Sequence, residues 1–466
     1  MDTNTSLAVA ATVFILFSVR ALVRRQRVNI RDIAGPQSKS WAFGNLADLL
    51  LPSSYGQNEF AWARLFGSVY RIKGCFGQDR LVISDPAALQ YVTNSPNFQL
   101  GPVLAVMRSW LYEKKGVITA RGEEHRRLRR ALNVGFTASA VRKYQPTFEK
   151  VAEWISDQLD TAADKPTVVD ISPILSAGAL RAITDVALGC PVETLGEEFL
   201  QVNTRLLDLA STRSVGQIIF DAIAVHVPKP LLRAMIYLPT PAFRALRTSK
   251  FLSRREGWRL VREKLRAPEG SHDADIYSLL LHPEEDDGKK VLRAEELVAQ
   301  TALILLAGQD TTSNTLAFGL LELARRTELQ DRLRDEINSA VSTSGDVAYD
   351  NMPLLNAFIK ETLRMYPAAA LSERVALEDS VIPLAEPITT SSGKKIGAIP
   401  VGTGQVVTLA VASYQRHDSC WGANSEEFDP NRWLDGRVRQ GNAIGPYANL
   451  LSFFAGPHTC LGWRFA

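Results

Sequence analysis

Residues 453–466 of the sequence read FFAGPHTCLGWRFA. Its cysteine, Cys460, is framed by Gly456, Pro457 and Gly462. Glycine lets a backbone turn tightly and approach a flat ligand closely, and a thiolate ligates a metal or acts as a nucleophile. The stretch therefore predicts a loop that presents a thiolate, followed by the first amides of a helix that would stabilise its charge.

The residues leave other uses of Cys460 open. A nucleophile needs a base, but His458 stands only two residues away and would point elsewhere in an extended loop. A zinc site is a further alternative, because His417 and Cys420 are spaced H-x-x-C and His458 and Cys460 are spaced H-x-C. These spacings are unlike those of the usual zinc motifs.

The composition is that of an ordinary globular protein, with 46% hydrophobic and 22% charged residues and a net charge of +3 over 466 residues. This balance gives no reason to expect a nucleic-acid or acidic partner. The length suggests several domains of about 150 residues, but no linker or repeat divides the interior. One large fold with room for a sizeable ligand is therefore possible. The four scattered cysteines do not indicate a disulfide framework.

The N-terminal residues predict a membrane anchor. Residues 7–19, LAVAATVFILFSV, are mostly apolar, and a basic RRQR follows. The run is shorter than the about 20 residues of a spanning helix, but Arg20 can snorkel and extend the span to Val23. A signal peptide would carry its charge first. We expect a single anchor within residues 1–25, with the remaining chain in the cytosol; a cleaved or buried helix is the alternative.

The hydrophobic pattern predicts a mainly α protein with small β-sheets. A strand pair is expected between Ser68 and Asp85, helices from about Pro86 to Arg334, and further strands between Val375 and Val407.

Residues 295–325 predict one long helix that is apolar almost all round and therefore buried. Its middle reads AGQDTT, with Gly308, Asp310 and Thr311, which are unfavourable choices for a buried helix. One interpretation is a functional kink, where the glycine admits a small ligand and the acid and hydroxyl handle protons. The alternative is a tolerated glycine beside a solvent-facing aspartate.

Glu361 and Arg364 share a helix face in ETLR. An arginine fork suits a buried carboxylate, so Glu361 could also bind Arg432 from the loop EEFDPNRWLDG; an exposed loop arginine is the alternative. The same spacing recurs in pairs that we expect to be solvated surface pairs, namely Glu256/Arg259, Glu263/Arg266 and Glu322/Arg325.

Taken together, these motifs resemble the cytochrome P450 family, and the chain looks most like its membrane-bound fungal type. FFAGPHTCLG fits the family pattern F-x-x-G-x-[R/H]-x-C-x-G, AGQDTT fits [A/G]-G-x-[D/E]-T-[T/S], and ETLR fits E-x-x-R. Arg432 stands where the family completes the ion-pair triad. The resemblance implies the P450 fold, with residues 26–466 as its haem domain.

The resemblance also implies site residues. Cys460 would be the axial thiolate ligand of haem b. Asp310 and Thr311 would deliver protons to dioxygen, and Glu361, Arg364 and Arg432 would form a structural lock behind the haem. The implied contacts to the haem are His125 and Arg129 in GEEHRRLRRAL, Arg374 in LSERVA, His458, Gly456 and Gly462.

The implied activity is a monooxygenase that inserts one atom of O2 into a small apolar substrate such as a terpenoid, polyketide or fatty acyl chain. Electrons would come from NADPH through NADPH–cytochrome P450 reductase at the endoplasmic reticulum membrane. The basic side chains Arg126, Arg127 and Arg130 would be a solvated face or would help to dock the reductase. Residues lining the pocket would be Val103, Leu104, Met107 and Ala307, unless they pack into the core.

The family normally continues beyond the point where this sequence stops, through a full helix and a strand pair. We therefore expect the C-terminal end to be missing. A truncated, non-catalytic haem-binding protein is the alternative to the monooxygenase.

Overall fold

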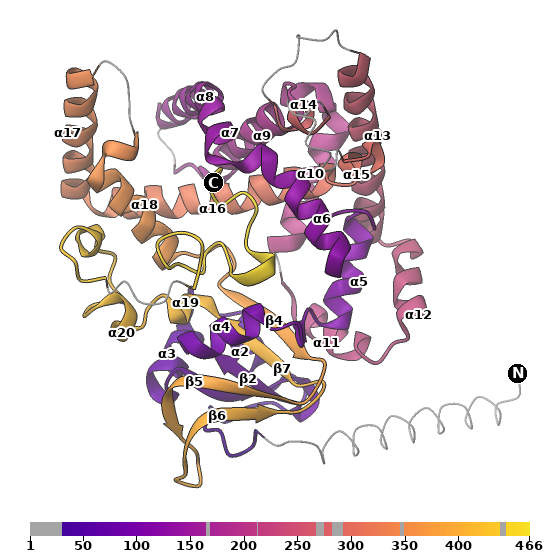
Figure 1. The fold of residues 1–466 in the computed structure, drawn as a ribbon, viewed down its shortest axis with the longest axis vertical. Helices are drawn as coiled ribbons and strands as arrows, with labels where there is room; N and C mark the ends of the chain where they lie inside the picture. The colour runs from indigo at the N-terminus through magenta and orange to yellow at the C-terminus, as the bar shows by residue number, and fades with distance from the viewer. Residues whose placement is uncertain are drawn as a thin grey trace, which may run out of the picture. The chain divides into compact units, whose positions relative to one another are not determined.

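The computed structural model describes residues 30–164, 168–211, 213–266, 275–281, 292–344, 349–438 and 444–466 (Figure 1). The predicted anchor within residues 1–25 lies outside the described residues. No helix in the described ranges is long and apolar enough to cross a membrane. The chain divides into two compact units, Met1–Gly101 with Leu371–Tyr414, and Pro102–Ala370 with Gln415–Ala466. A single haem domain over residues 26–466 stays a prediction.

The first unit is built on a five-stranded sheet of order β1-β2-β7-β4-β3. β2 and β7 pair in parallel and the other neighbours are antiparallel. A separate antiparallel hairpin of β5 and β6 extends from this unit (Figure 1). The strands are β1 Val69–Lys73, β2 Asp79–Ile83, β3 Phe98–Gln99, β4 Leu371–Ala376, β5 Ser380–Thr389, β6 Lys395–Val401 and β7 Val406–Ala410.

Both predicted strand regions are therefore confirmed. Leu81, Val82 and Ile83 of β2 are fully buried, as expected of consecutive apolar residues in a strand with neighbours on both sides. The helical segments of this unit are α2 Leu46–Leu50, α3 Gln57–Phe66, η1 Cys75–Gly77, α4 Pro86–Asn94 and α19 Val411–Tyr414.

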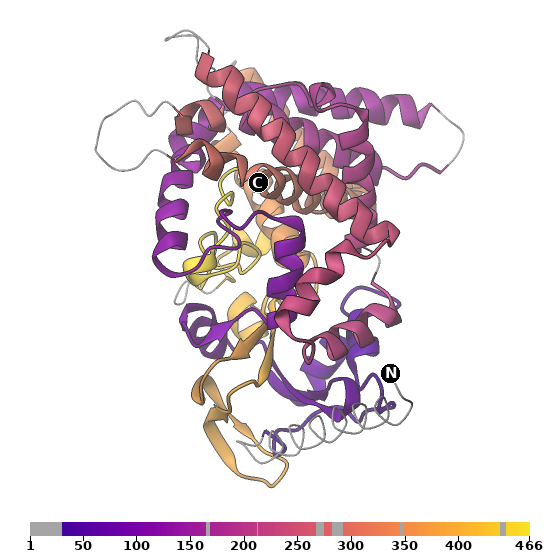
Figure 2. The ribbon, with the colours of Figure 1, turned by 90° about the vertical axis from the view of Figure 1, so that its right-hand side faces the viewer.

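The second unit is almost entirely helical, and this confirms the mainly α prediction. The long helix α13 crosses its face in Figure 2 and packs against α10, α15 and α16. The larger helices are α5 Pro102–Leu111, α6 Gly122–Leu132, α8 Gln145–Ala163, α9 Ser172–Leu188, α10 Glu197–Ser211, α11 Val215–Ala224, α13 Pro241–Arg266, α16 Thr301–Arg325, α17 Thr327–Ser344 and α18 Pro353–Met365. The short ones are η2 Asn133–Phe136, α7 Ala138–Lys143, η3 Val192–Leu195, α12 Lys229–Ala234, η4 Met235–Tyr237, α14 Ile276–Leu281, α15 Ala294–Val298, η5 Tyr349–Asn351, α20 Asp418–Trp421, η6 Pro430–Trp433 and η7 Gly456–His458.

The central helix α16 differs from its prediction at two points. It begins at Thr301, because the separate α15 ends at Val298 and Gln300 caps the new helix. It is also not buried all round: Ala307, Thr311 and Asn314, which share one face, are exposed. This face is open although the opposite side of α16 packs tightly.

The glycine in α16 serves helix packing. A Cβ atom on Gly308 would lie 2.7 Å from Cγ1 of Ile183 on α9, which is closer than real Cβ contacts. The next residue, Gln309, is buried, and its Nε2 donates to Ser176 Oγ of α9 at 2.9 Å. It also accepts a hydrogen bond of 2.5 Å from Asn203 of α10. The Cβ side of Gly308 therefore faces α9 and allows the two helices to approach closely, and admission of a ligand at this glycine stays a prediction.

Candidate functional site

The loop that carries Cys460 is held by its own backbone. Gly456 has φ +68°, in the left-handed region that favours glycine. The Cys460 amide donates to the Phe453 carbonyl at 2.8 Å, and the Thr459 hydroxyl donates to the Gly456 carbonyl at 2.7 Å. These bonds close the loop from Phe453 to Cys460 and fix the direction of the cysteine.

The Cys460 side chain combines exposure with burial. Its surface is accessible, yet burial raises the pKa of its thiol, opposed by a hydrogen bond with the Gly462 backbone and by the charge of Arg129. Sγ is therefore within reach of a ligand, although neighbouring protein groups lie close enough to it to disfavour the charged form.

The residues after Cys460 form turns rather than a regular helix. The amides of Phe465 and Ala466 both donate to the Gly462 carbonyl at 2.9 Å. Phe465 packs edge-on against Phe148, with ring centroids 5.1 Å apart, and so anchors the loop in the core of the second unit.

Helix α6 brings two predicted residues toward the loop. The rings of His125 and His458 lie 4.7 Å apart, and His125 is buried. Burial lowers the pKa of His125, and the nearby charge of Arg129 lowers it further. Arg129 is half-buried, interacts electrostatically with Cys460, and makes no side-chain hydrogen bond or ion pair with any residue that the structure describes. An uncompensated cation beside the loop suits an anionic ligand group.

On α16, Asp310 and Thr311 follow the packed residues Gly308 and Gln309. The Thr311 hydroxyl donates to the Ala307 carbonyl at 2.7 Å, one turn earlier in the helix. Asp310 accepts a hydrogen bond of 3.2 Å from the Asn314 side chain. Burial raises the pKa of Asp310, and the bond from Asn314 partly opposes this. An acid whose pKa moves toward neutrality is suited to exchange protons.

Glu361 collects five hydrogen-bond donors in a fully buried cluster. Arg364 binds it with two nitrogens, Nε and Nη2, each at 2.8 Å. Arg432 Nε donates at 2.9 Å. Two donors were not predicted: the Trp433 indole N–H at 2.9 Å and the Asp429 amide at 2.8 Å. The loop of Arg432 is thus bound to α18 through one carboxylate, and exposure of that arginine is excluded.

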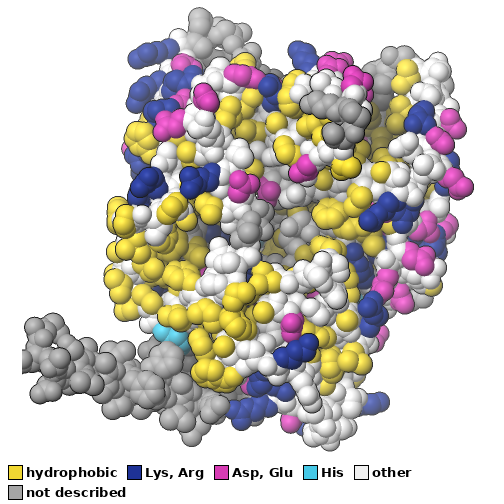
Figure 3. Space-filling view, turned by 180° about the vertical axis from the view of Figure 1, so that it is seen from behind, with side chains coloured by type: hydrophobic (Ala, Val, Ile, Leu, Met, Phe, Trp, Pro, Cys, Tyr) yellow, Lys and Arg dark blue, Asp and Glu magenta, His cyan; other side chains and the backbone are white. Residues whose placement is uncertain are grey.

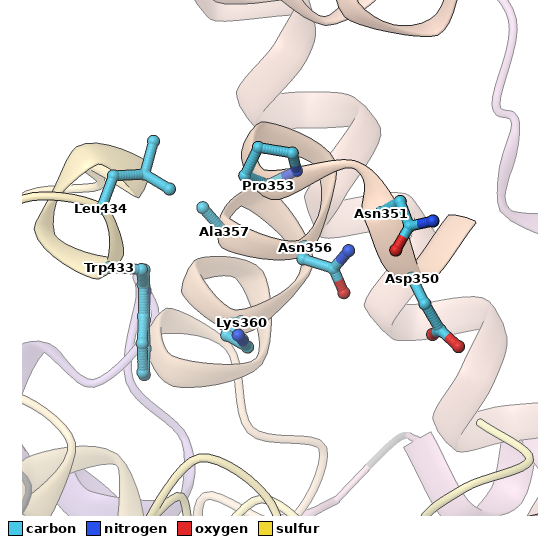
Figure 4. Close-up of a pocket in the computed structure, with 8 residues that line it drawn as sticks. All are labelled: Asp350, Asn351, Pro353, Asn356, Ala357, Lys360, Trp433 and Leu434. Carbon is cyan, nitrogen blue, oxygen red and sulfur yellow. The ribbon is translucent and has the colours of Figure 1, made fainter. Parts of the chain in front are cut away.

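The remaining guanidinium nitrogens bind backbone carbonyls. Arg364 donates to Gln415, Ser425 and Glu427, at 2.6, 2.6 and 3.0 Å. Arg432 donates to carbonyls of the same region, namely Trp421, Asn424 and Glu427. Figure 4 shows Trp433 beside the face of α18 that carries Ala357 and Lys360. The cluster is fully satisfied, as a buried ionic group requires.

A model of the family described as cytochrome P450 matches residues 34–466. The chain is a cytochrome P450. It is 31% identical to cytochrome P450 monooxygenase claU of Ampulloclitocybe clavipes, over 98% of this chain and 87% of the relative. It is 28% identical to cytochrome P450 monooxygenase 91 of Postia placenta, over 97% of this chain and 88% of the relative. These matches make this P450 a monooxygenase.

The fold also matches a solved structure. Retinoic acid bound cyanobacterial CYP120A1 superposes with a TM-score of 0.67 at 20% identity, covering 93% of this chain and 89% of that one. This likeness supports the fold of the P450.

The site residues fit the haem iron that the family uses. Cys460 offers an accessible thiol, and Arg129 offers a cation without an acidic partner among the described residues. A Cβ on Gly462 would meet only ordinary contacts, the nearest at 3.8 Å from Phe136. Protein packing therefore does not explain this glycine, whereas close approach of a flat ligand would.

The other residues predicted for the site of the P450 lie on α5, α16 and β4. Val103 is buried in a cluster of α5 with α11 and α12, and Met107 packs against that cluster. Leu104 is exposed, as is Ala307 on α16. Arg374 lies on β4 of the first unit, where its Nη1 donates to Ser372 Oγ and to the Glu373 carbonyl, each at 2.9 Å.

The basic face of α6 is largely occupied by acids. Arg127 binds Glu124 at 2.8 Å and the buried Glu296 of α15. Hydrogen bonds from Arg127 and Arg293 outweigh the effect of burial and lower the pKa of Glu296 to about 2. Arg126 pairs with Glu123, and Arg130 is exposed. Arg127 therefore holds α6 to α15 and is not a free docking residue.

Two of the E-x-x-R pairs are not solvated surface pairs as predicted. Glu322 is 2% exposed and binds Arg325, Arg326 and the Tyr366 hydroxyl. Glu256 is 5% exposed and accepts from Arg259 Nε at 2.7 Å. In both pairs the glutamate faces the interior, and only the arginine reaches the surface.

The zinc alternative finds no support. In the described ranges, no group of three or more His, Cys, Asp or Glu side chains is placed to hold a metal ion. His417 stands at the N-cap of α20 and Cys420 lies within this helix, and the two do not join His458 and Cys460 in a tetrahedral set.

Proposed function

We propose that this P450 is a haem-thiolate monooxygenase that inserts one oxygen atom into a small apolar substrate in fungal secondary metabolism. The observation that carries the proposal is the thiol of Cys460, which is accessible within a glycine-framed loop that its own backbone hydrogen bonds close. The similarity to monooxygenases of two fungi supports the setting.

Cys460 is the residue that would ligate haem b, and the bound cofactor would supply the oxidising chemistry. The chain's contribution is to hold Sγ in place through the Phe453–Cys460 backbone bond. The Gly462 amide and the charge of Arg129 favour the thiolate but do not outweigh burial, which raises the pKa of the thiol. Ligation by a metal would overcome the raised pKa of the thiol.

Asp310 and Thr311 would handle protons. Burial raises the pKa of Asp310, so its carboxyl group holds a proton up to a higher pH than an ordinary aspartic acid does. The carboxyl group could therefore pass on this proton and take up another from solvent. Thr311 offers a hydroxyl on the open face of α16 beside Ala307. The two side chains make separate hydrogen bonds, Asp310 with Asn314 and Thr311 with the Ala307 carbonyl, so each would act on a proton from its own position.

Cationic and donor groups would hold the haem carboxylates. Arg129 is the strongest member, since its guanidinium has no acidic partner among the described residues. His125 and His458, whose rings lie close together at a tilt, would donate as well. Arg374 stays a predicted contact to the haem. Glu361, Arg364 and Arg432 would act as a structural lock.

The substrate would be an apolar molecule of the terpenoid or polyketide class. Leu104 and Ala307 present exposed apolar side chains on α5 and α16. Val103 and Met107 pack among the helices and would shape the pocket from behind.

The protein would sit on the endoplasmic reticulum membrane, anchored by residues 1–25, and take electrons from NADPH through NADPH–cytochrome P450 reductase. Residues 7–19 supply the apolar run. Apolar side chains also gather on the face of the second unit that carries α11 and α12 (Figure 3). Leu231 is 60% and Tyr237 78% exposed there, which favours contact with a lipid surface.

The test is reconstitution in membranes with a fungal reductase, NADPH and isotopically labelled dioxygen, with terpenoids and polyketides as substrates. We expect a product that carries one labelled oxygen atom and forms only in the presence of the reductase. Haem incorporation without any labelled product or substrate-linked NADPH consumption across these substrates would contradict the proposal.

A further inference from the structure

Gln415 is a fully buried side chain that none of the family motifs contains. It lies directly after α19, between the end of α18 and the residues that lead into the cysteine loop. Its amide makes hydrogen bonds to both.

One side of this amide caps α18. The last four carbonyls of a helix lack partners within the helix. Gln415 Nε2 donates to two of them, Leu363 at 3.0 Å and Arg364 at 2.7 Å. In return, Arg364 Nη1 donates to the Gln415 backbone carbonyl at 2.6 Å. The glutamine is therefore attached to the helix that carries Glu361 through its side chain and its backbone.

The oxygen of the same amide binds the residues that lead into the cysteine loop. Gln415 Oε1 accepts from the Leu451 amide at 2.8 Å and from the Ser452 hydroxyl at 3.2 Å. Ser452 also donates to the Leu363 carbonyl at 2.6 Å. Phe453 follows directly, and its carbonyl accepts from the Cys460 amide. A short series of hydrogen bonds thus connects α18 to the backbone of Cys460.

Glutamine suits this position because a primary amide has two donors and an accepting oxygen. Glutamate would lose the donors to α18. Methionine, of similar length, would lose both sets and would leave buried carbonyls and an amide unsatisfied, which is costly.

We propose that Gln415 is a positioning residue that fixes the cysteine loop against α18 and so sets the direction of the Cys460 thiolate. This inference rests on the proposed haem ligation by Cys460. Glu361 would bind the loop that carries Arg432, and Gln415 would bind the residues that lead into the cysteine loop. Both loops would thereby be attached to α18.

The experiment compares Gln415→Met with a matched control, Gln300→Met, in the full chain. Gln300 is also fully buried in the second unit. Its Nε2 donates to the Glu296 carbonyl at 2.7 Å and the Lys115 carbonyl at 3.3 Å, and its Oε1 accepts from the Val117 amide at 2.9 Å. Both substitutions remove hydrogen bonds of the same kind, but only Gln415 contacts the approach to the loop.

Three quantities are measured for each protein: the melting temperature, the fraction of the thiolate-type band in the carbon monoxide difference spectrum, and the rate of haem transfer to apomyoglobin. We expect both variants to melt earlier. Only Gln415→Met should lose a large part of the thiolate-type band and release haem about ten-fold faster or more, as expected for an unsatisfied buried group near the ligand.

Equal band fractions and haem-release rates in the two variants would overturn the proposal, because Gln415 would then be one buried glutamine among others. A wild-type protein that binds haem without a thiolate-type band would instead contradict the ligation by Cys460. If Gln415→Met does not fold, Ser452→Ala is measured in its place. Partial loss of the thiolate-type band would support the proposal, and an unchanged band would overturn it.

Discussion

Arg432 Nε lies 2.9 Å from a carboxylate oxygen of Glu361, although the two residues are 71 positions apart and both side chains are fully buried. The carboxylate faces two guanidinium groups, an indole and a backbone amide. Removing one partner from such a cluster leaves an uncompensated charge in the interior. The loop of Arg432 is therefore held to α18 by charge, in addition to the apolar packing of Phe428 against Leu354 and Phe358.

The first prediction concerns this carboxylate. Glu361→Gln should destabilise the folded protein by about 3–5 kcal/mol, because both buried arginines lose their counter-charge. Haem content should fall with it. Thermal unfolding and haem absorbance measure both effects. Glu263→Gln is the control, since Glu263 is 57% exposed in its pair with Arg259 and should leave the melting temperature nearly unchanged. Similar shifts in the two variants would contradict the account.

Trp433 provides the second prediction. Trp433→Phe keeps an aromatic ring near Trp421, whose ring centroid lies 5.8 Å away, but removes the indole donor to Glu361. A hydrogen bond to a charged group is worth about 1.5–3 kcal/mol, and we expect a loss of this size in denaturant unfolding. A loss well below this range would mean that the indole contributes packing alone.

The third prediction separates helix packing from ligand access at Gly308. Gly308→Ala places a methyl group against Ile183, and overpacking costs about 1–3 kcal/mol. Alanine is the better helix former by about 1 kcal/mol, so the crowding should show as a net loss. Adding Ile183→Ala should relieve it, and the double mutant should be less destabilised than the sum of the single mutants. Additive losses in unfolding experiments would be inconsistent with this contact.

Asp310 yields a pH-dependent prediction. Burial raises its pKa in the folded protein, above the about 3.9 of an unfolded chain. The charged form therefore costs stability above the raised pKa, and this cost disappears as the pH falls through it. Asp310→Asn should raise the melting temperature at neutral pH, with a difference that shrinks in acid, and should slow turnover.

Melting curves over a pH series and reconstituted turnover test this prediction. Asp157→Asn, on an exposed part of α8, controls for the change in net charge. A lower melting temperature for Asp310→Asn at neutral pH, or a difference that does not vary with pH, would show that burial does not set the charge of this aspartate.

The sequence predicted those parts of the site that depend on short spacing. The E-x-x-R pair and the glycine-framed cysteine each lie within a few residues of chain, and strand pairs followed from β-branched runs beside glycines. The partner Arg432 could be proposed because its fork-shaped side chain suits a buried carboxylate; the expected loop forms the short 3-10 helix η6 at this point. These inferences needed no knowledge of distant contacts.

The other parts of the site depend on contacts between residues far apart in the sequence, which the spacing of a motif does not indicate. Gln415 and Trp433 reach carbonyls and a carboxylate more than 35 positions away. The sequence suggested a kink at Gly308, because a glycine within a helix does not indicate which neighbouring helix packs against it. Glu322 looked like a surface acid, since an E-x-x-R spacing alone does not say which end is buried.

The most direct test of the central claim is the carbon monoxide difference spectrum of reduced membranes that contain residues 1–466, compared with Cys460→Ser. The account predicts a red-shifted Soret band of the thiolate-ligated type in the wild-type protein and its absence in the variant. A band at the position of histidine-ligated or denatured protein in the wild type, or a thiolate-type band that survives in Cys460→Ser, would contradict ligation by Cys460.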